Sequence, residues 1–262
     1  MRNLIFVNLM RLKKSRIFCG GIIISMLYSA FLLVMNYREM AVSPETAITH
    51  LNWYFLSPLA FAGVFCAIFC SMFVGTEYSD GTMRNKLMVG YTRGSIYCAN
   101  LIAAFLANTF VYAAACVVVA LIGIPLFGWN LTFPAQFALN VFSGILMLAS
   151  FAGIFTMLSM LISNKAASVA ACMIVYALML EGGTLLRIAV YNYYMDKPSA
   201  DVASASINPI IEFLYDFLPT GQSAQIVGGM VWNPYRLPLY SLIFIVLTTI
   251  FGIFIFTKKD VK

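Results

Sequence analysis

The sequence GTEYSDGTMRNKLMVGYTRGSIY, residues 75–97, is the longest polar interruption in the first half of a very apolar chain. Two long apolar runs, residues 53–74 and 96–127, flank it. Each run is long enough to cross a bilayer, which takes about 20 helical residues. The interruption is therefore expected to lie beside a membrane, between two spans.

A short helix is predicted inside this stretch. Asp80-Gly81 is a turn signal, Thr82 is the expected N-cap and Gly90 is a natural stop. A helix of about two turns cannot span a bilayer. It is expected to offer a small amphipathic surface to the water phase. An ordinary solvated loop is the alternative interpretation, because basic residues are common in such loops.

The composition of the whole chain is that of an integral membrane protein. Of its 262 residues, 62% are hydrophobic and 10% are charged, and the mean hydropathy is +0.90. Soluble domains carry roughly 25% charged residues. Long apolar runs, rather than short alternating segments, predict helices and not a β-barrel. We expect an all-α membrane protein in which residues 1–262 form a single transmembrane domain.

Six spans are expected from the apolar runs, with the polar stretch between the second and third. They are residues 17–35, 53–74, 96–127, 135–162, 166–186 and 237–256. Several of them carry small residues four apart, a pattern typical of close helix packing in membranes. The six cysteines lie in the spans or at their ends and are expected to be free buried thiols rather than metal ligands.

The basic residues predict the orientation of the spans. The proposed inner segments hold 12 Lys and Arg residues and the outer segments hold 4. By the positive-inside rule, both termini are expected in the cytoplasm. Residues 1–16 mix basic and apolar positions, with Ile5, Leu9 and Leu12 on one face, and predict an interfacial helix on the inner membrane surface. Because the charges cluster at span ends, the net charge of +6 does not indicate nucleic acid as a partner.

Residues 187–236 form a long outer segment with two weaker apolar pieces. Asn208-Pro209 is a helix start, and Pro219 closes the first piece. Glu212 and Asp216 share its polar face. Neither piece is long enough to span, so two short re-entrant helices that dip into the outer leaflet are expected. A pair of surface helices with no part in transport is the alternative.

The polar stretch resembles the type-2 ABC exporter permease family. The likeness lies in the order of residues between two spans. An acidic residue follows the first span, then come Gly-Thr, a basic and apolar helix and a glycine, and Thr-Arg precedes the next span. The matching residues are Glu77, Tyr78, Gly81, Thr82, Lys86, Leu87, Gly90, Arg93 and Tyr97. Where many members carry a lysine a few residues after the arginine, this chain has Asn100. The six-span layout matches over essentially the whole chain.

The resemblance implies that residues 75–95 form a cytoplasmic coupling loop that docks on an ATP-hydrolysing subunit. The residues assigned to this coupling site are Glu77, Asp80, Gly81, Thr82, Met83, Arg84, Lys86, Leu87 and Arg93. Met83 and Leu87, four apart on one face, are the expected apolar anchors. Glu77 and Arg84 are expected either to contact the partner or to brace the loop against the span ends.

One acidic residue interrupts the fifth apolar run. Glu181 lies nearer the outer end of that run. Ionisable residues inside spans are costly and often functional, so Glu181 is a candidate for the transport pathway. The alternative is a carboxylate that reaches the outer interface.

The chain itself lacks the motifs of an enzyme. It has no phosphate-binding loop, and its only histidine is His50 in an outer loop. We therefore expect no cofactor or metal on this chain, with ATP and Mg on a separate ATPase. The resemblance implies two ATPase subunits, a second permease copy (identical or homologous), and export of a peptide, antibiotic or other amphipathic substrate across a bacterial cell membrane. A stand-alone channel or secondary carrier is the alternative function.

Overall fold

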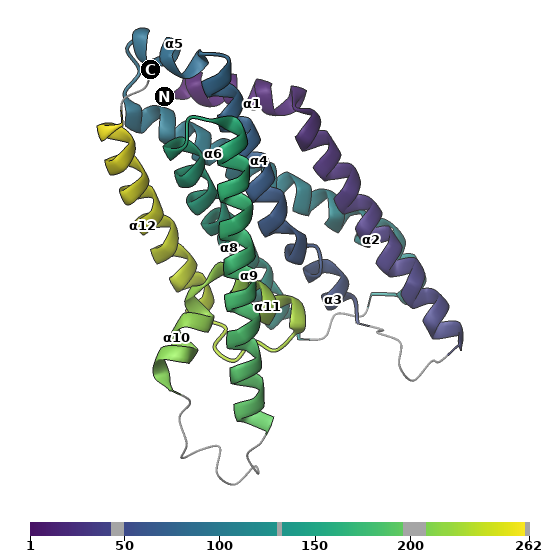
Figure 1. The fold of residues 1–262 in the computed structure, drawn as a ribbon. Helices are drawn as coiled ribbons and strands as arrows, with labels where there is room; N and C mark the ends of the chain where they lie inside the picture. Colours follow the sequence, from purple (N-terminus) through teal and green to yellow (C-terminus); the bar gives the residue numbers. More distant parts are fainter. Residues whose placement is uncertain (43–49, 130–132, 196–207, 260–262) are drawn as a thin grey trace.

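The computed structural model describes residues 1–42, 50–129, 133–195 and 208–259, and all regular structure in these residues is helical (Figure 1). The first half contains α1 (Arg2–Lys14), α2 (Arg16–Val42), α3 (Leu51–Leu56), α4 (Leu59–Ser79), α5 (Thr82–Met88) and α6 (Arg93–Val118). A π-helical turn, η1 (Val119–Gly123), and α7 (Ile124–Phe127) continue α6. The second half contains α8 (Pro134–Leu161), α9 (Lys165–Met195), α10 (Pro209–Phe217), α11 (Pro219–Gly228) and α12 (Arg236–Lys258).

Six helical stretches are long and apolar enough to cross a membrane, as expected of a multi-pass membrane protein. They are Arg16–Val42, Leu51–Ser79, Arg93–Phe127, Pro134–Leu161, Lys165–Tyr193 and Arg236–Lys258. The prediction of six spans is confirmed. The helices of the first and fifth spans, α2 and α9, run several residues further than predicted. Polar residues such as Asn36 and Tyr191 continue these helices beyond the apolar runs.

Two spans contain local breaks that their apolar composition does not reveal. The second span divides at Ser57-Pro58, where proline has no amide hydrogen for the helical ladder. The Ser57 hydroxyl donates instead to the carbonyl of Tyr54 at 3.1 Å. The third span widens into the π-turn η1 just before Pro125, which lacks the same donor.

Helices α4 and α8 form the centre of the bundle. About two thirds of the apolar window of the second span is buried, against 11% for the fifth span, which contains α9. On α4, the small residues Gly63, Ala67, Ser71 and Gly75 are all buried, which confirms the packing face that their spacing predicts. A Cβ on Gly63 would lie 2.4 Å from the Tyr176 ring, so α9 packs directly on this face.

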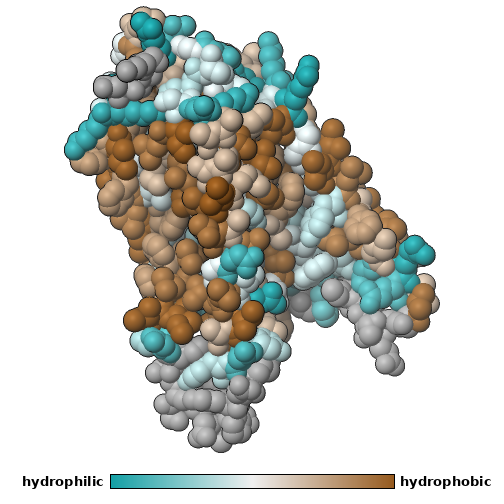
Figure 2. All heavy atoms as spheres, viewed as in Figure 1, coloured by the Kyte–Doolittle hydropathy of each residue, from teal (hydrophilic) through white to brown (hydrophobic). Residues whose placement is uncertain are grey.

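The two ends of the bundle differ. One end, here the α5 end, carries α1, α5 and the last turn of α12, and the other, the α10 end, carries α10 and α11 (Figure 1). Figure 2 shows an apolar belt between hydrophilic residues at both ends. All six cysteines are free thiols, as predicted, but only Cys66, Cys70 and Cys172 are buried.

Candidate functional site

Helix α5 is held between two glycines in the left-handed backbone region. Gly81 (φ +65°) precedes it and Gly90 (φ +94°) follows it, and other residues rarely adopt these angles. At its end, the Tyr91 amide donates to the Lys86 carbonyl at 3.3 Å and the Gly90 amide donates to the Leu87 carbonyl at 3.0 Å. This is a Schellman motif. The predicted short helix with a stop at Gly90 is confirmed.

Thr82 does not cap α5 as expected. Gly81 occupies the N-cap, and Thr82 is the first helical residue. The Thr82 hydroxyl donates to the backbone carbonyl of Glu77 at 3.2 Å. That carbonyl is one of the acceptors left open at the end of α4, so the hydroxyl ties α5 to α4.

The two apolar residues expected as anchors, Met83 and Leu87, pack toward the bundle. Met83 is 1% exposed and packs in a buried cluster within the chain, and Leu87 is half-buried against the same cluster. Met83 therefore offers no anchor to a partner, because its apolar face is satisfied inside its own fold. The exposed apolar residues are Met88 and Val89, which are 67% and 75% exposed at the end of the helix.

The inward face of α5 carries a buried polar cluster, the Glu77 network, formed by Asn8, Arg11, Glu77, Lys86 and Asn100. Glu77 Oε1 accepts from Arg11 Nη1 and from Lys86 Nζ, and Oε2 accepts from Asn100 Nδ2 at 3.2 Å. Asn8 Nδ2 donates to Asn100 Oδ1 at 2.7 Å, and Lys86 Nζ also reaches Asn8 Oδ1 at 3.4 Å. The Arg11 guanidinium lies 4.5 Å from the centre of the Phe73 ring.

This network joins four helices through one carboxylate. Asn8 and Arg11 come from α1, Glu77 from α4, Lys86 from α5 and Asn100 from α6. Glu77 is fully buried, and two cations and an amide compensate the cost of burying its charge. Of the two roles open for Glu77, bracing is the one that these contacts provide.

The sequence pattern did not single out Asn8, Arg11 and Asn100 as partners of Glu77. The expected apolar face of α1 was Ile5, Leu9 and Leu12, whereas the buried positions are Leu4, Asn8 and Leu12. An asparagine in register with two buried leucines is the signal that could have identified the network.

A second clamp holds the end of α12 to the same region. Arg93 Nη1 donates to the carbonyl of Phe256 at 2.9 Å and also to that of Lys259. Lys259 Nζ donates to the Met160 carbonyl at 2.9 Å and to the Tyr78 hydroxyl at 3.2 Å. Burial lowers the pKa of Lys259 to about 8. Arg93 thus turns inward, onto open carbonyls at a helix end.

Asp80 and Arg84 are the charged residues of the predicted coupling site that remain on the surface. Both are exposed, and they make no salt bridge with any described residue. Arg84 lies on the outward side of α5, on the same face as Met88. The exposed surface of α5 and its C-cap is therefore the Arg84 cation and the Asn85 amide beside two apolar side chains, Met88 and Val89.

A second buried carboxylate lies at the α10 end, in what we term the Asp216 network: Ser150, Asp216, Gln222, Gln225 and Ser241. Asp216 Oδ1 accepts from Gln225 Nε2 at 2.9 Å, and its backbone carbonyl accepts from Gln222 Nε2 at 2.8 Å. The Ser241 hydroxyl donates to Gln222 Oε1 at 2.6 Å, and the Ser150 hydroxyl donates to the Ser241 carbonyl. These contacts fasten α10 and α11 to α8 and α12.

Asp216 has a raised pKa. Burial raises it most and the Glu212 carboxylate adds to the effect, while the bond from Gln225 and the Arg236 cation act against it. Asp216 was expected on a polar face with Glu212, but it is 1% exposed. Glu212, by contrast, forms a salt bridge with Arg236, in which Oε1 and Nη1 lie 2.9 Å apart.

Glu181 lies on the exposed side of α9, and it makes no salt bridge with any described residue. Two cavities open at the α10 end, of about 550 Å³ and about 350 Å³, with Trp53 in the wall of both. Glu181 is not among the lining residues of either one.

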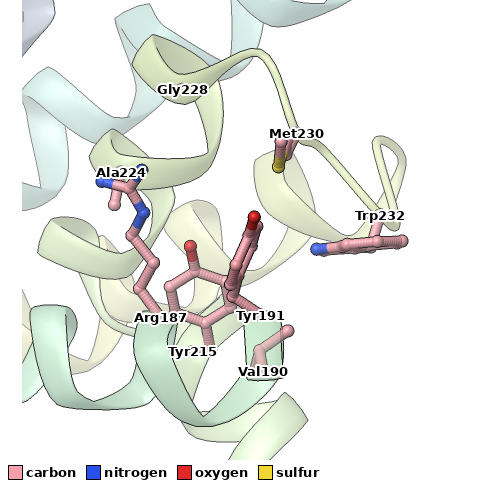
Figure 3. A pocket seen from close by; sticks show the side chains of 8 residues that line it. All are labelled: Arg187, Val190, Tyr191, Tyr215, Ala224, Gly228, Met230 and Trp232. Carbon is pink, nitrogen blue, oxygen red and sulfur yellow. The ribbon is translucent and has the colours of Figure 1, made fainter. Parts of the chain in front are cut away.

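A third and much smaller cavity lies among residues of α9, α10 and α11 (Figure 3). Figure 3 shows Arg187 and Tyr191 of α9 beside Tyr215 of α10, with Met230 and Trp232 on the opposite side. The cavity of about 20 Å³ has room for about one water molecule. It is too small to hold a transported substrate.

No family model matches the chain, and no curated protein matches it at a significant level.

Proposed function

We propose that the chain is the permease subunit of an ATP-driven exporter of the type-2 ABC kind, and that separate ATPase subunits drive it through α5. The observation that carries this proposal is the contrast between the two faces of α5. The outward face presents Met88 and Val89 to the water phase, and the inward face is fixed to the bundle by the Glu77 network. A helix whose outward face contacts a partner and whose inward face is bonded to the bundle can transmit a movement of the partner to the bundle.

The contacts of α5 define which helices would move with it. Through Lys86 and Glu77 the displacement reaches α1, α4 and α6. Through Tyr78, Arg93 and Lys259 the same region is linked to α8 and α12. Packed elements of this kind move as rigid bodies rather than deform continuously.

The distribution of basic residues supports a cytoplasmic α5 end. Because Lys and Arg concentrate there, both termini and α5 would face the compartment that contains ATP. Helices α10 and α11 have 9 and 10 residues, too short to span, so we infer that they enter the outer leaflet as a re-entrant pair. The host membrane would be a bacterial cell membrane.

The exposed side of α9 supports a pathway shared by two permease copies, identical or homologous. A lipid-facing carboxylate is costly, so we infer that Glu181 faces a second copy or the substrate path. The substrate class follows from the resemblance alone: a peptide, an antibiotic or another amphipathic molecule. ATP and Mg would bind to the two partner ATPases, and no nucleic acid is involved.

The proposal is tested by a matched pair of substitutions, Val89→Asp and Val42→Asp. Both valines are highly exposed, Val89 at 75% and Val42 at 83%. Val42 is the last residue of α2, at the end of that helix away from α1 and α5. In the complex purified with its ATPase, Val89→Asp should weaken ATPase binding about tenfold, as loss of an apolar contact at an interface centre does. Val42→Asp should leave binding unchanged.

Transport and ATP hydrolysis are measured together in reconstituted complexes. If Val89→Asp matches Val42→Asp in binding and in transport per ATP, α5 is a plain solvated loop and the coupling role is wrong. If native membranes yield no ATPase bound to the wild-type chain, the exporter assignment is wrong as a whole.

A further inference from the structure

A cavity of about 520 Å³ at the α5 end carries three cations that the proposed coupling does not use. It lies at the corner where α1 turns into α2, beside the last turns of α4 and the first turn of α9. Its charged wall holds Arg11, Lys14, Arg16, Asp80 and Lys165.

The charge of this cavity is strongly positive. Lys14, Arg16 and Lys165 line it, and none of them forms a salt bridge with any described residue. Arg11 also lines the cavity, but it is paired with Glu77. The opposing charge in the wall is Asp80, an exposed side chain that accepts from the Ser79 hydroxyl at 3.3 Å. Three cations against one carboxylate leave a site for an anion.

The lysine of α9 is placed at this corner by close helix packing. A Cβ on Gly75 would lie 2.9 Å from Lys165 Cγ and 3.3 Å from its Cα. The missing side chain at position 75 lets the start of α9 lie against α4, with the stem of Lys165 across the gap. The cation is therefore held at the cavity by two helices that are distant in sequence.

The apolar residues of the wall belong to helices that can span a membrane. Ile17 comes from α2, and Met72 and Phe73 come from α4. The cavity thus joins a cationic part to an apolar part, at the α5 end, where Figure 2 shows hydrophilic residues beside the apolar belt. A ligand that fits both parts has an acidic head and an apolar body. Basic pockets between membrane helices bind anionic lipid head groups in this way.

We propose that this corner is a binding site for the phosphate head group of an anionic phospholipid, with Lys14, Arg16 and Lys165 as the phosphate-binding cations. Its ligand chemistry, a phosphate monoanion beside an apolar wall, distinguishes it from the α5 surface. The site does not depend on the exporter assignment, because it can be measured on the chain without an ATPase.

The test uses the purified full chain in a neutral detergent, with its thermal unfolding midpoint as the readout. Phosphatidylglycerol, phosphatidylcholine with the same acyl chains, and inorganic phosphate are titrated separately. Phosphatidylglycerol should raise the midpoint to a plateau, and phosphatidylcholine should not. Equal protection by inorganic phosphate would overturn the lipid as the ligand, and equal protection by both lipids would overturn the anion site.

Matched variants locate the effect. Lys14→Gln and Lys165→Gln should each weaken the apparent affinity for phosphatidylglycerol about fivefold, the contribution of one basic residue at a charged membrane surface. Lys13→Gln is the control, because Lys13 is the chain neighbour of Lys14 but lines a different groove with Leu9 and Phe18. It should remain within about twofold of wild type.

Equal losses in Lys13→Gln and Lys14→Gln would show diffuse surface charge and would overturn the site. If the Lys14 and Lys165 variants instead bind lipid normally and lose only the ATPase, the corner is a protein contact and the lipid assignment is wrong.

Discussion

Among the described residues two carboxylates are buried, one at each end of the bundle, and their surroundings differ. Glu77 is in contact with two cations and an amide, and all its oxygens are bonded. The Asp216 carboxylate accepts one hydrogen bond, from the side-chain amide of Gln225. Its Oδ2 and the Oε1 of Gln225 are buried acceptors without a hydrogen-bond partner in the described structure. The difference is one of charge balance, because only Glu77 has cations in direct contact.

This difference assigns different tasks to the two ends. A buried carboxylate with paired cations fixes geometry, because removing any member leaves an unpaired charge. A buried carboxylate among neutral partners responds to pH, because its charged form is poorly solvated. The α5 end is therefore built as a rigid joint, and the α10 end contains a group whose protonation alters local stability.

The largest expected effect is that of Glu77→Gln. The substitution keeps the shape but leaves Arg11 and Lys86 without a counter-charge, and should lower the free energy of unfolding by about 3 kcal/mol. Thermal unfolding in detergent measures the change. Glu212→Gln is the control at the other end, where the exposed pair with Arg236 is worth about 0–1 kcal/mol. Similar losses in both variants would remove the distinction between the ends.

Asp216→Asn is expected to act in the opposite direction. The raised pKa means that the folded state binds the proton more tightly than the unfolded state. The resulting stability is present below the unfolded pKa and is lost as pH rises through the raised folded value. At neutral pH the variant should be more stable than wild type by about 1–3 kcal/mol, the cost of an unsatisfied buried polar group.

Unfolding midpoints between acidic and neutral pH measure this effect, taken as the difference between the two proteins. The difference should grow with pH. A constant difference would show that Asp216 does not titrate in this range.

Thr82→Ala should have a smaller effect. It removes the hydrogen bond to the Glu77 carbonyl and should cost about 1 kcal/mol. Thr257→Ala is a suitable control, since its hydroxyl bonds only to Phe254 within an exposed turn of α12. If the two variants unfold at the same temperature, the tie between α4 and α5 contributes nothing.

The smallest effect on stability is expected for Glu181→Gln, because this third carboxylate is exposed and makes no salt bridge with any described residue. The free energy of unfolding should change by less than about 0.5 kcal/mol. Transport of a cationic substrate should nevertheless fall if Glu181 lines the path. If transport and expression of the variant are both normal, Glu181 does not line the path and the alternative holds, a carboxylate that reaches the outer membrane interface.

The sequence predicted what depends on composition and local pattern. Apolar length predicts the six helices long enough to span, and they are present. Turn chemistry predicts the short helix that stops at Gly90 and the helix start at Asn208, and both are present. It failed where the outcome depends on tertiary partners. Met83 and Met88 are equally apolar, and only the packing of α5 on the bundle decides that Met83 is buried.

The polar contacts were hidden for the same reason. Nothing local distinguishes Arg11 from the other basic residues of the terminal helix, and Asn8 is marked only by its register with Leu4 and Leu12. Their role arises from α4, α5 and α6, which follow much later in the chain. Likewise, Glu212 and Asp216 lie four apart on one helix face, yet only Asp216 meets the glutamines of α11.

The distance along the chain between members of the Glu77 network has a consequence for biosynthesis. Asn8 lies 92 residues before Asn100, and Arg11 lies 66 residues before Glu77. At roughly 5–20 residues per second, Asn8 waits about 5 to 20 seconds for its partner to be made. During that interval the side chain of Asn8 lacks its hydrogen-bond partners Lys86 and Asn100, so water must hydrate it until the third span has been made.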